Sequence, residues 1–125
     1  MELQNKQKRI LVLDNGGRML PVMEEIMAYG DFDMHVMYDP ACITDRAREL
    51  QPDLIILDYL LVNNECALVC NDLKEDEHLK GVPVIIVARY MTKKIRSESY
   101  RCDALFVNAL DMDVLAPRIN YLMAS

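Results

Sequence analysis

Several features that mark particular classes of protein are missing from this sequence. No run of about eighteen apolar residues occurs, and no short apolar leader ends in small residues, so we expect no membrane span and a cytoplasmic location. The 4 cysteines form no Cys-x-x-Cys pair and stand apart from the 2 histidines, which favours ordinary half-buried thiols over a zinc site. The net charge is -6 and basic residues form no block, so nucleic acid is not an expected partner.

Short apolar runs are present, and they alternate with amphipathic stretches along the chain. With 125 residues, 52% of them hydrophobic, the sequence has the size and core of one domain spanning 1–125. Uninterrupted apolar runs are typical of parallel strands covered by helices on both faces. Strands are predicted at 9–13, 32–38, 54–57, 84–87 and 104–107, each followed by a helix, the fourth from about 92 to 100 and the last from near 111.

This alternation predicts an α/β fold with a doubly wound five-stranded parallel sheet and helices on both faces. The commonest strand order for such a flavodoxin-like sheet is 2-1-3-4-5. That order places the first and third runs side by side at the centre. The switch point of the sheet then falls between them, where open α/β sheets hold their functional sites.

Two aspartates end these central strands. Asp14 follows the first run and Asp58 follows the third, so both are expected at the carboxyl edge of the sheet. Two carboxylates held close together repel each other unless a cation lies between them, which favours a hard metal such as Mg²⁺. A carboxylate beside such an ion can also attack phosphorus.

The stretches that carry these aspartates resemble a known family. Segments 8–14 and 51–58 resemble the first and third strands of response regulator receiver domains, and 81–87 is similar to the fourth. The resemblance covers nearly the whole chain and implies a CheY-like fold. It also implies that Asp58 accepts a phosphoryl group from a histidine kinase, and that Mg²⁺ is held by Asp14, Asn15 and the Asp58 carboxylate.

The sequence departs from the family pattern at most of the other site positions. Asn15 stands where a metal-binding carboxylate is usual, Ala88 replaces the Thr or Ser that ends the fourth strand, and Asn108 replaces the lysine after the fifth. Leu105 takes the place of the switch aromatic, although a one-residue slip would offer Phe106. Removing one charge-stabilising contact slows catalysis by roughly 10²–10³. Phosphorylation is therefore expected to be weak or absent, unless the neighbouring Arg89 supplies a compensating cation.

Three functions remain open, none of them an enzyme. The first is a receiver in a two-component phosphorelay, and the second is a pseudo-receiver that binds partners independently of phosphorylation. The third is an anion or nucleotide binder that uses the glycine turn at 15–17. By resemblance, a histidine kinase, another signalling protein or a second copy would dock on the face of the fourth helix, fifth strand and fifth helix, at Ile95, Tyr100, Leu105 and Tyr121.

Two local patterns in the helices carry further expectations. Met19, Met23 and Met27 recur every four residues, which predicts core filling and leaves a soft partner-binding face as the alternative. Pro117 lies inside the predicted last helix, where it must either kink the helix or mark its first turn.

Overall fold

The computed structural model describes residues 7–14, 17, 19–59, 66–88, 102–107 and 117–123. Its strands are β1 (Arg9–Leu13), β2 (Asp33–Met37), β3 (Leu54–Asp58), β4 (Val84–Ala88) and β5 (Ala104–Val107). Its named helices are α1 (Leu20–Tyr29), the short 3-10 helix η1 (Pro40–Cys42), α2 (Ile43–Leu50) and α3 (Cys66–Glu75), and a further helical segment covers 117–123. No helix in these described ranges is long and apolar enough to cross a bilayer.

The strands form one parallel sheet in the order β2-β1-β3-β4-β5, which confirms the predicted topology. β1, β3 and β4 occupy the centre, and 14 of their 15 residues are buried; the exception is Arg9 at the first position. β2 lies at one end of the sheet and is buried at none of its positions. The uninterrupted apolar runs therefore mark central strands, whereas the mixed sequence of β2 marks an edge.

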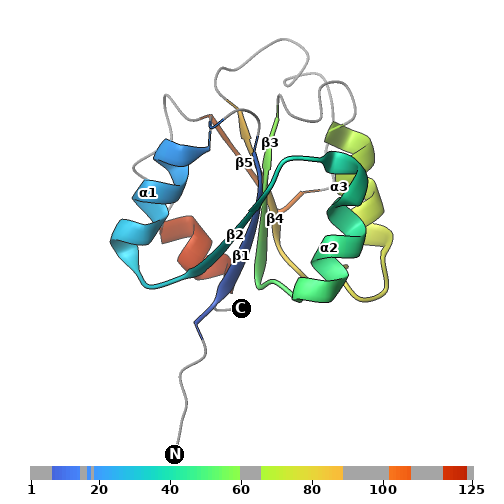
Figure 1. Ribbon diagram of the computed structural model, residues 1–125, viewed down its shortest axis with the longest axis horizontal. Helices are drawn as coiled ribbons and strands as arrows, with labels where there is room; N and C mark the ends of the chain where they lie inside the picture. Colours follow the sequence, from blue (N-terminus) through green and yellow to red (C-terminus); the bar gives the residue numbers. More distant parts are fainter. Residues whose placement is uncertain are drawn as a thin grey trace, which may run out of the picture.

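Helices cover both faces of the sheet, and each face has its own apolar core (Figure 1). On one face, α1 and the 117–123 helix pack over side chains such as Ile10, Ile56 and Ile85. On the other, α2 and α3 pack over Leu11 and Leu57. Because strand residues alternate between faces, each central strand contributes to both cores.

The boundaries of α2 have identifiable causes in the sequence. Before it, the Asp39 carboxylate accepts a hydrogen bond from the backbone N–H of Ala41 at 3.0 Å and so begins η1. After it, Gln51 adopts a left-handed conformation with φ 55° and ψ 61°, and its N–H donates to the Ala47 carbonyl. Pro52 follows, as expected where a helix ends.

The structure tests the predictions made for the methionines of the first helix and for Pro117. Met19 is buried as predicted, but core filling is wrong for Met27, which is 56% exposed. Four residues turn an α-helix by about 40° more than a full circle, so the third methionine has rotated off the buried face. Pro117 begins the described part of the last helix, and the helix predicted at 92–100 lies outside the described residues.

Candidate functional site

The carboxyl edge of the sheet holds the two aspartates singled out in the sequence. β1 and β3 pair in parallel with Leu13 opposite Leu57, so Asp14 and Asp58 are the next residues of neighbouring strands. Both are buried, with exposures of 2% and 5%. Two carboxylates on neighbouring strand ends repel each other, and a cation between them would relieve that repulsion.

Asp14 has a structural role in addition to its place at this edge. Its Oδ2 accepts a hydrogen bond from the Gly17 N–H at 3.1 Å, and its Oδ1 accepts one from the Met19 N–H at 2.9 Å. Met19 itself caps α1 without a side-chain hydrogen bond, so the Asp14 carboxylate satisfies backbone donors at the start of that helix. The sequence signal was an aspartate just before a glycine turn, a pattern typical of local side-chain to backbone bonding.

These two hydrogen bonds bear on the third candidate function, an anion or nucleotide binder that uses the glycine turn at 15–17. In the described part of the turn, the N–H groups of Gly17 and Met19 already point to a carboxylate. A bound anion would have to share those donors with a negative charge, which is electrostatically unfavourable. Asn15 and Gly16, the other members of the proposed nest, lie outside the described residues.

Asp58 is fixed between two strands. It is the last residue of β3 and pairs in register with Val87 of β4. The next residue, Tyr59, is buried and donates its backbone N–H to the Val87 carbonyl at 3.0 Å. The hydrogen bonds of the sheet therefore continue past Asp58 and hold its backbone rigidly in the centre of the edge.

β4 ends at Ala88, one position beyond the partner of Asp58. Ala88 is 1% exposed and pairs with Val107 of β5. A methyl group at this buried position offers no hydrogen bond to an anion. Arg89 and Asn108, the residues that follow β4 and β5, lie outside the described residues.

The oxygen ligands at this edge bear on the expected Mg²⁺. Asp14 and Asp58 supply two carboxylates, and Mg²⁺ is commonly bound by one or two carboxylates together with water and phosphate oxygens. Among the described residues, no group of three or more acidic, histidine or cysteine side chains could hold a metal ion. The donor chemistry therefore fits Mg²⁺, but two carboxylates alone do not make a closed binding cage.

A second cluster of charges lies at the opposite, amino edge of the sheet. Arg48 of α2 donates from Nε to Oδ2 of Asp76 at 2.7 Å, and Oδ1 of Asp76 accepts the His78 N–H at 2.9 Å. The Arg48 hydrogen bond is the main cause that lowers the pKa of Asp76 below its usual range. It also raises the pKa of Arg48, so the two charges stabilise each other.

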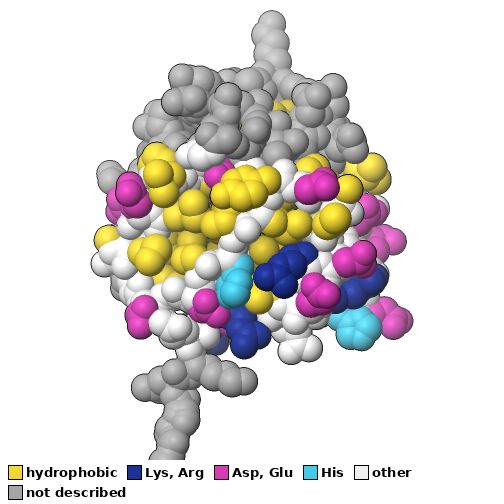
Figure 2. Space-filling model, viewed as in Figure 1, with side chains coloured by type: hydrophobic (Ala, Val, Ile, Leu, Met, Phe, Trp, Pro, Cys, Tyr) yellow, Lys and Arg dark blue, Asp and Glu magenta, His cyan; other side chains and the backbone are white. Residues whose placement is uncertain are grey.

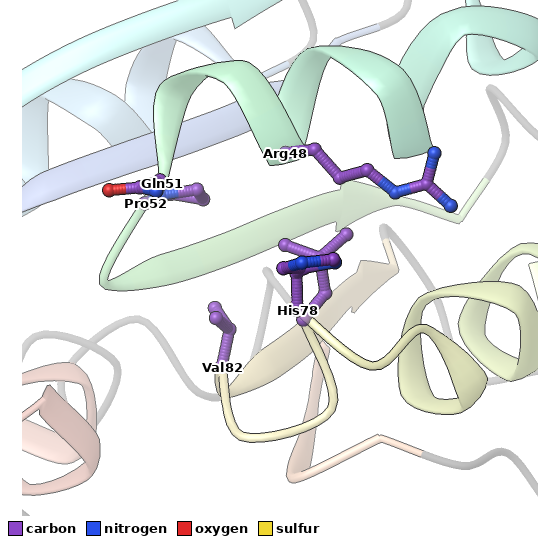
Figure 3. A pocket seen from close by; sticks show the side chains of 6 residues that line it. Arg48, Gln51, Pro52, His78 and Val82 are labelled. Atoms are coloured by element: carbon purple, nitrogen blue, oxygen red, sulfur yellow. The ribbon is translucent and has the colours of Figure 1, made fainter.

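A pocket of about 350 Å³ lies beside this pair (Figure 3). Arg48 and Gln51 reach it from α2 and the turn after it, whereas His78 and Val82 come from the connection between α3 and β4. The Arg48 guanidinium is already bonded to Asp76. The pocket is also remote from the edge that carries Asp14 and Asp58, so it contributes nothing to that site.

Lys74 and Asp103 form a further salt bridge, which the sequence did not predict. Nζ of Lys74 on α3 donates to Oδ2 of Asp103 at 2.6 Å and to the Val82 carbonyl at 3.1 Å. The same Asp103 oxygen accepts the Val84 N–H at 2.7 Å. The partners are 29 residues apart, and no local spacing pattern connects them. The contact fixes the start of β5 against β4 and α3.

The cysteines supply no activated nucleophile in the described part of the chain. Burial raises the pKa of the Cys102 thiol to about 11, and Cys70 is fully buried. A thiol with so high a pKa is protonated at neutral pH and reacts slowly. Cys42 is exposed and lies on η1.

Sequence relatives of the chain are transcriptional response regulators. The DNA-binding response regulator MtrA of Mycobacterium bovis is 29% identical over 85 residues, which cover 68% of this chain and 36% of that protein. The DNA-binding dual master transcriptional regulator RpaA of Synechocystis is 25% identical over 117 residues, or 92% of this chain and 48% of that protein. No protein-family model matches the chain.

The homologues of this chain are response regulators, and the chain has the fold of a receiver domain. Its fold agrees with this assignment: a putative response regulator from Chloroflexus aurantiacus superposes with a TM-score of 0.79 at 15% identity, covering 96% of this receiver and 100% of that chain. The receiver spans less than half the length of the curated relatives named above.

Proposed function

We propose that this receiver works in two-component signalling with Asp58 as its phosphoacceptor position, and that its phosphorylation is weak or absent. The observation that carries the proposal is the pairing at the carboxyl edge: Asp58 lies beside Asp14, but the strand next to it ends in Ala88. This arrangement supports Asp58 as an acceptor that lacks the hydroxyl usual in the family at the end of the neighbouring strand.

The chemistry of the transfer explains the expected weakness. The Asp58 carboxylate would attack the phosphorus of a phosphohistidine, so that an O–P bond forms while the N–P bond breaks. Negative charge accumulates on the phosphoryl oxygens, and Mg²⁺ would supply part of the charge that neutralises it. Ala88 donates nothing to those oxygens, and one lost donor of this kind slows transfer by roughly 10²–10³.

The metal site is proposed to be weak for a related reason. Asp14, Asn15 and Asp58 would hold Mg²⁺, but both Asp14 oxygens already accept backbone N–H bonds. Asn15 would contribute an amide oxygen without charge. Arg89 remains the proposed compensating cation, and Asn108 the neutral replacement for the usual lysine.

The second candidate function is a pseudo-receiver that binds a partner whether or not Asp58 is modified. It is favoured by a hollow of about 550 Å³ between β5 and the 117–123 helix, which is lined by Leu105 and Tyr121. Tyr121 is 63% exposed, and the Arg118 guanidinium lies 5.3 Å from its ring. A histidine kinase or another signalling protein would dock there; Ile95 and Tyr100, also assigned to this surface, lie outside the described residues.

Intact mass after incubation with acetyl phosphate and Mg²⁺ tests the acceptor. We expect a small phosphate-sized gain in the wild type and none in Asp58→Ala. Ala88→Ser restores a hydroxyl in a nearly isosteric side chain and should raise the initial rate by roughly tenfold or more. If Ala88→Ser gains no phosphate in a folded protein, the missing hydroxyl is not the defect and the proposal fails.

A binding measurement separates the two candidates. For a pseudo-receiver, affinity for the partner is unchanged in Asp58→Ala and is lost in Leu105→Asp or Tyr121→Glu. For a receiver that signals through phosphorylation, affinity changes on treatment with acetyl phosphate, and Asp58→Ala abolishes that change.

A further inference from the structure

The edge strand β2 has hydrogen-bonding groups on its outer side. The Asp33 N–H donates to the Lys8 carbonyl and the Met37 carbonyl accepts from Asp14, so these odd-numbered residues face β1. Backbone groups alternate in direction along a strand, so those of Met34 and Val36 face away from the sheet. β2 is the end strand of the described sheet and lies at the front of Figure 1.

One face of this edge is apolar. Phe32 and Met34 pack against the core that α1 covers. On α1 and on β2 with the residue that follows it, Leu20, Met27, Val36 and Tyr38 are between 38% and 64% exposed. Figure 2 shows hydrophobic side chains gathered across this front face of the molecule. Contiguous apolar surface of this kind is typical of an interface.

The other face of the same edge is charged. Asp33 and His35 lie two residues apart on β2, on the same face as Met37, which packs against the core under α2 and α3. His35 Nε2 lies 3.1 Å from Asp33 Oδ2, although the two are not aligned for a hydrogen bond. Arg9 Nε lies 3.7 Å from the same carboxylate oxygen.

We propose that β2 pairs antiparallel with β2 of a second copy of this chain, about a twofold axis at Met34. In this register the outward backbone groups of Met34 bond to those of Met34 in the second copy, and Phe32 pairs with Val36. Asp33 of each copy then lies directly opposite His35 of the other. The pairing makes one continuous sheet from two copies and closes on itself.

Charge selects this register over its neighbours. Moving the axis to His35 places the two His35 side chains opposite each other, and moving it to Val36 places Asp33 opposite Asp39. A shift in the other direction sets Asp33 against Asp33. Like charges directly opposite destabilise a strand pair, whereas opposite charges stabilise it. Of these registers, only the one at Met34 places Asp33 opposite His35.

The same axis brings the apolar faces together. A twofold axis perpendicular to the sheet sets α1 of one copy beside α1 of the other, on the face that carries Met34 and Val36. The exposed Leu20 and Met27 of α1 would then be covered. This occupies an edge different from the Leu105 and Tyr121 surface, and it does not depend on phosphoryl chemistry at Asp58, so the two proposals fail separately.

Sedimentation equilibrium between roughly 10 µM and 1 mM tests the pairing of the full chain. The wild type should dimerise, and Val36→Pro should raise the dissociation constant at least tenfold. Proline removes an N–H that faces outward and is tolerated on an edge strand, so circular dichroism and thermal melting should show an intact fold. Tyr121→Glu is the matched control on the other surface and should dimerise like the wild type.

A charge exchange tests the register. His35→Asp should weaken the dimer because it sets acid against acid, and Asp33→His combined with His35→Asp should restore it. The proposal is overturned if the wild type stays monomeric over the whole range, if folded Val36→Pro dimerises as well as the wild type, or if Tyr121→Glu is the variant that dissociates. A double variant as weak as His35→Asp overturns the register at Met34.

Discussion

At the scale of single residues, Asp14 has an observed structural role at a position where a metal site is predicted. Asp14 stands at the carboxyl edge where a metal ligand is expected, and it also accepts the N–H groups that begin α1. A carboxylate has enough lone pairs for both roles, but each backbone hydrogen bond occupies a lone pair that could otherwise bind a metal ion. A residue predicted from the sequence to bind a metal therefore also has a structural role, which its spacing alone does not reveal.

Gln51 gives a prediction at this scale. Its left-handed backbone, with φ 55°, costs a residue with a Cβ about 1 kcal/mol or more, whereas glycine adopts it freely. We expect Gln51→Gly to raise the free energy of unfolding by roughly 0.5–1 kcal/mol, measured by urea denaturation. Gln51→Val is the control and should lower it, because a branched side chain fits this conformation worst. Equal stability of the two variants would contradict the assigned strain.

At the scale of elements, charged contacts at the amino edge tie the helices of one face together. Arg48 of α2 bonds to Asp76, the residue that follows α3, and Asp76 also accepts the His78 N–H in the next turn. Lys74 of α3 reaches Asp103 before β5. These contacts fix the relative positions of α2, α3 and the strands below them, independently of the carboxyl edge.

The Arg48–Asp76 contact predicts a pH dependence. The pKa of Asp76 is lowered in the folded state, so the contact stabilises the fold above the ordinary carboxyl pKa of about 3.9. That stability is lost as pH falls through the lower, folded-state pKa. We expect Asp76→Asn to lower the urea midpoint at pH 7 and to flatten its decline below about pH 4. Parallel acid profiles for wild type and variant would contradict this assignment.

At the scale of the whole molecule, stability should fall from the centre of the sheet to its edge. β3 is buried at every position and lies between two strands, whereas β2 has β1 on one side and no described strand on the other. Backbone amides in the centre are released only by global unfolding, and those at an edge exchange locally. The gradient follows from strand order and not from any single contact.

Hydrogen exchange followed by NMR checks this gradient. In dilute protein, the amides of Ile55 and Ile56 should exchange slowest, and those of Met34 and Val36 should exchange fast because they face outward. Asp33, which donates to Lys8, is the internal control and should be protected within the same strand. Uniform protection along β2 in dilute protein would contradict the alternation. Concentrated protein should protect Met34 and Val36 if the edges pair.

Much of the fold could be predicted because its signals are local. Continuous apolar runs located β1, β3 and β4, since a strand covered on both faces has no polar side. The positions of Asp14 and Asp58 followed from the strand order. The exposure of Met27 was missed because a spacing of four residues reports a helix face and not which part of that face its neighbours cover.

The sequence by itself determined the class of fold, the strand order and the two carboxylates at its carboxyl edge, because periodicity and chain connectivity leave few arrangements open. Only the tertiary structure decided which distant charges meet, as in Lys74 with Asp103, since such pairs depend on how helices pack. It also decided that the Asp14 oxygens bond to the turn into α1 and that β2 exposes its outer side. These properties arise from three-dimensional neighbours, which no local pattern encodes.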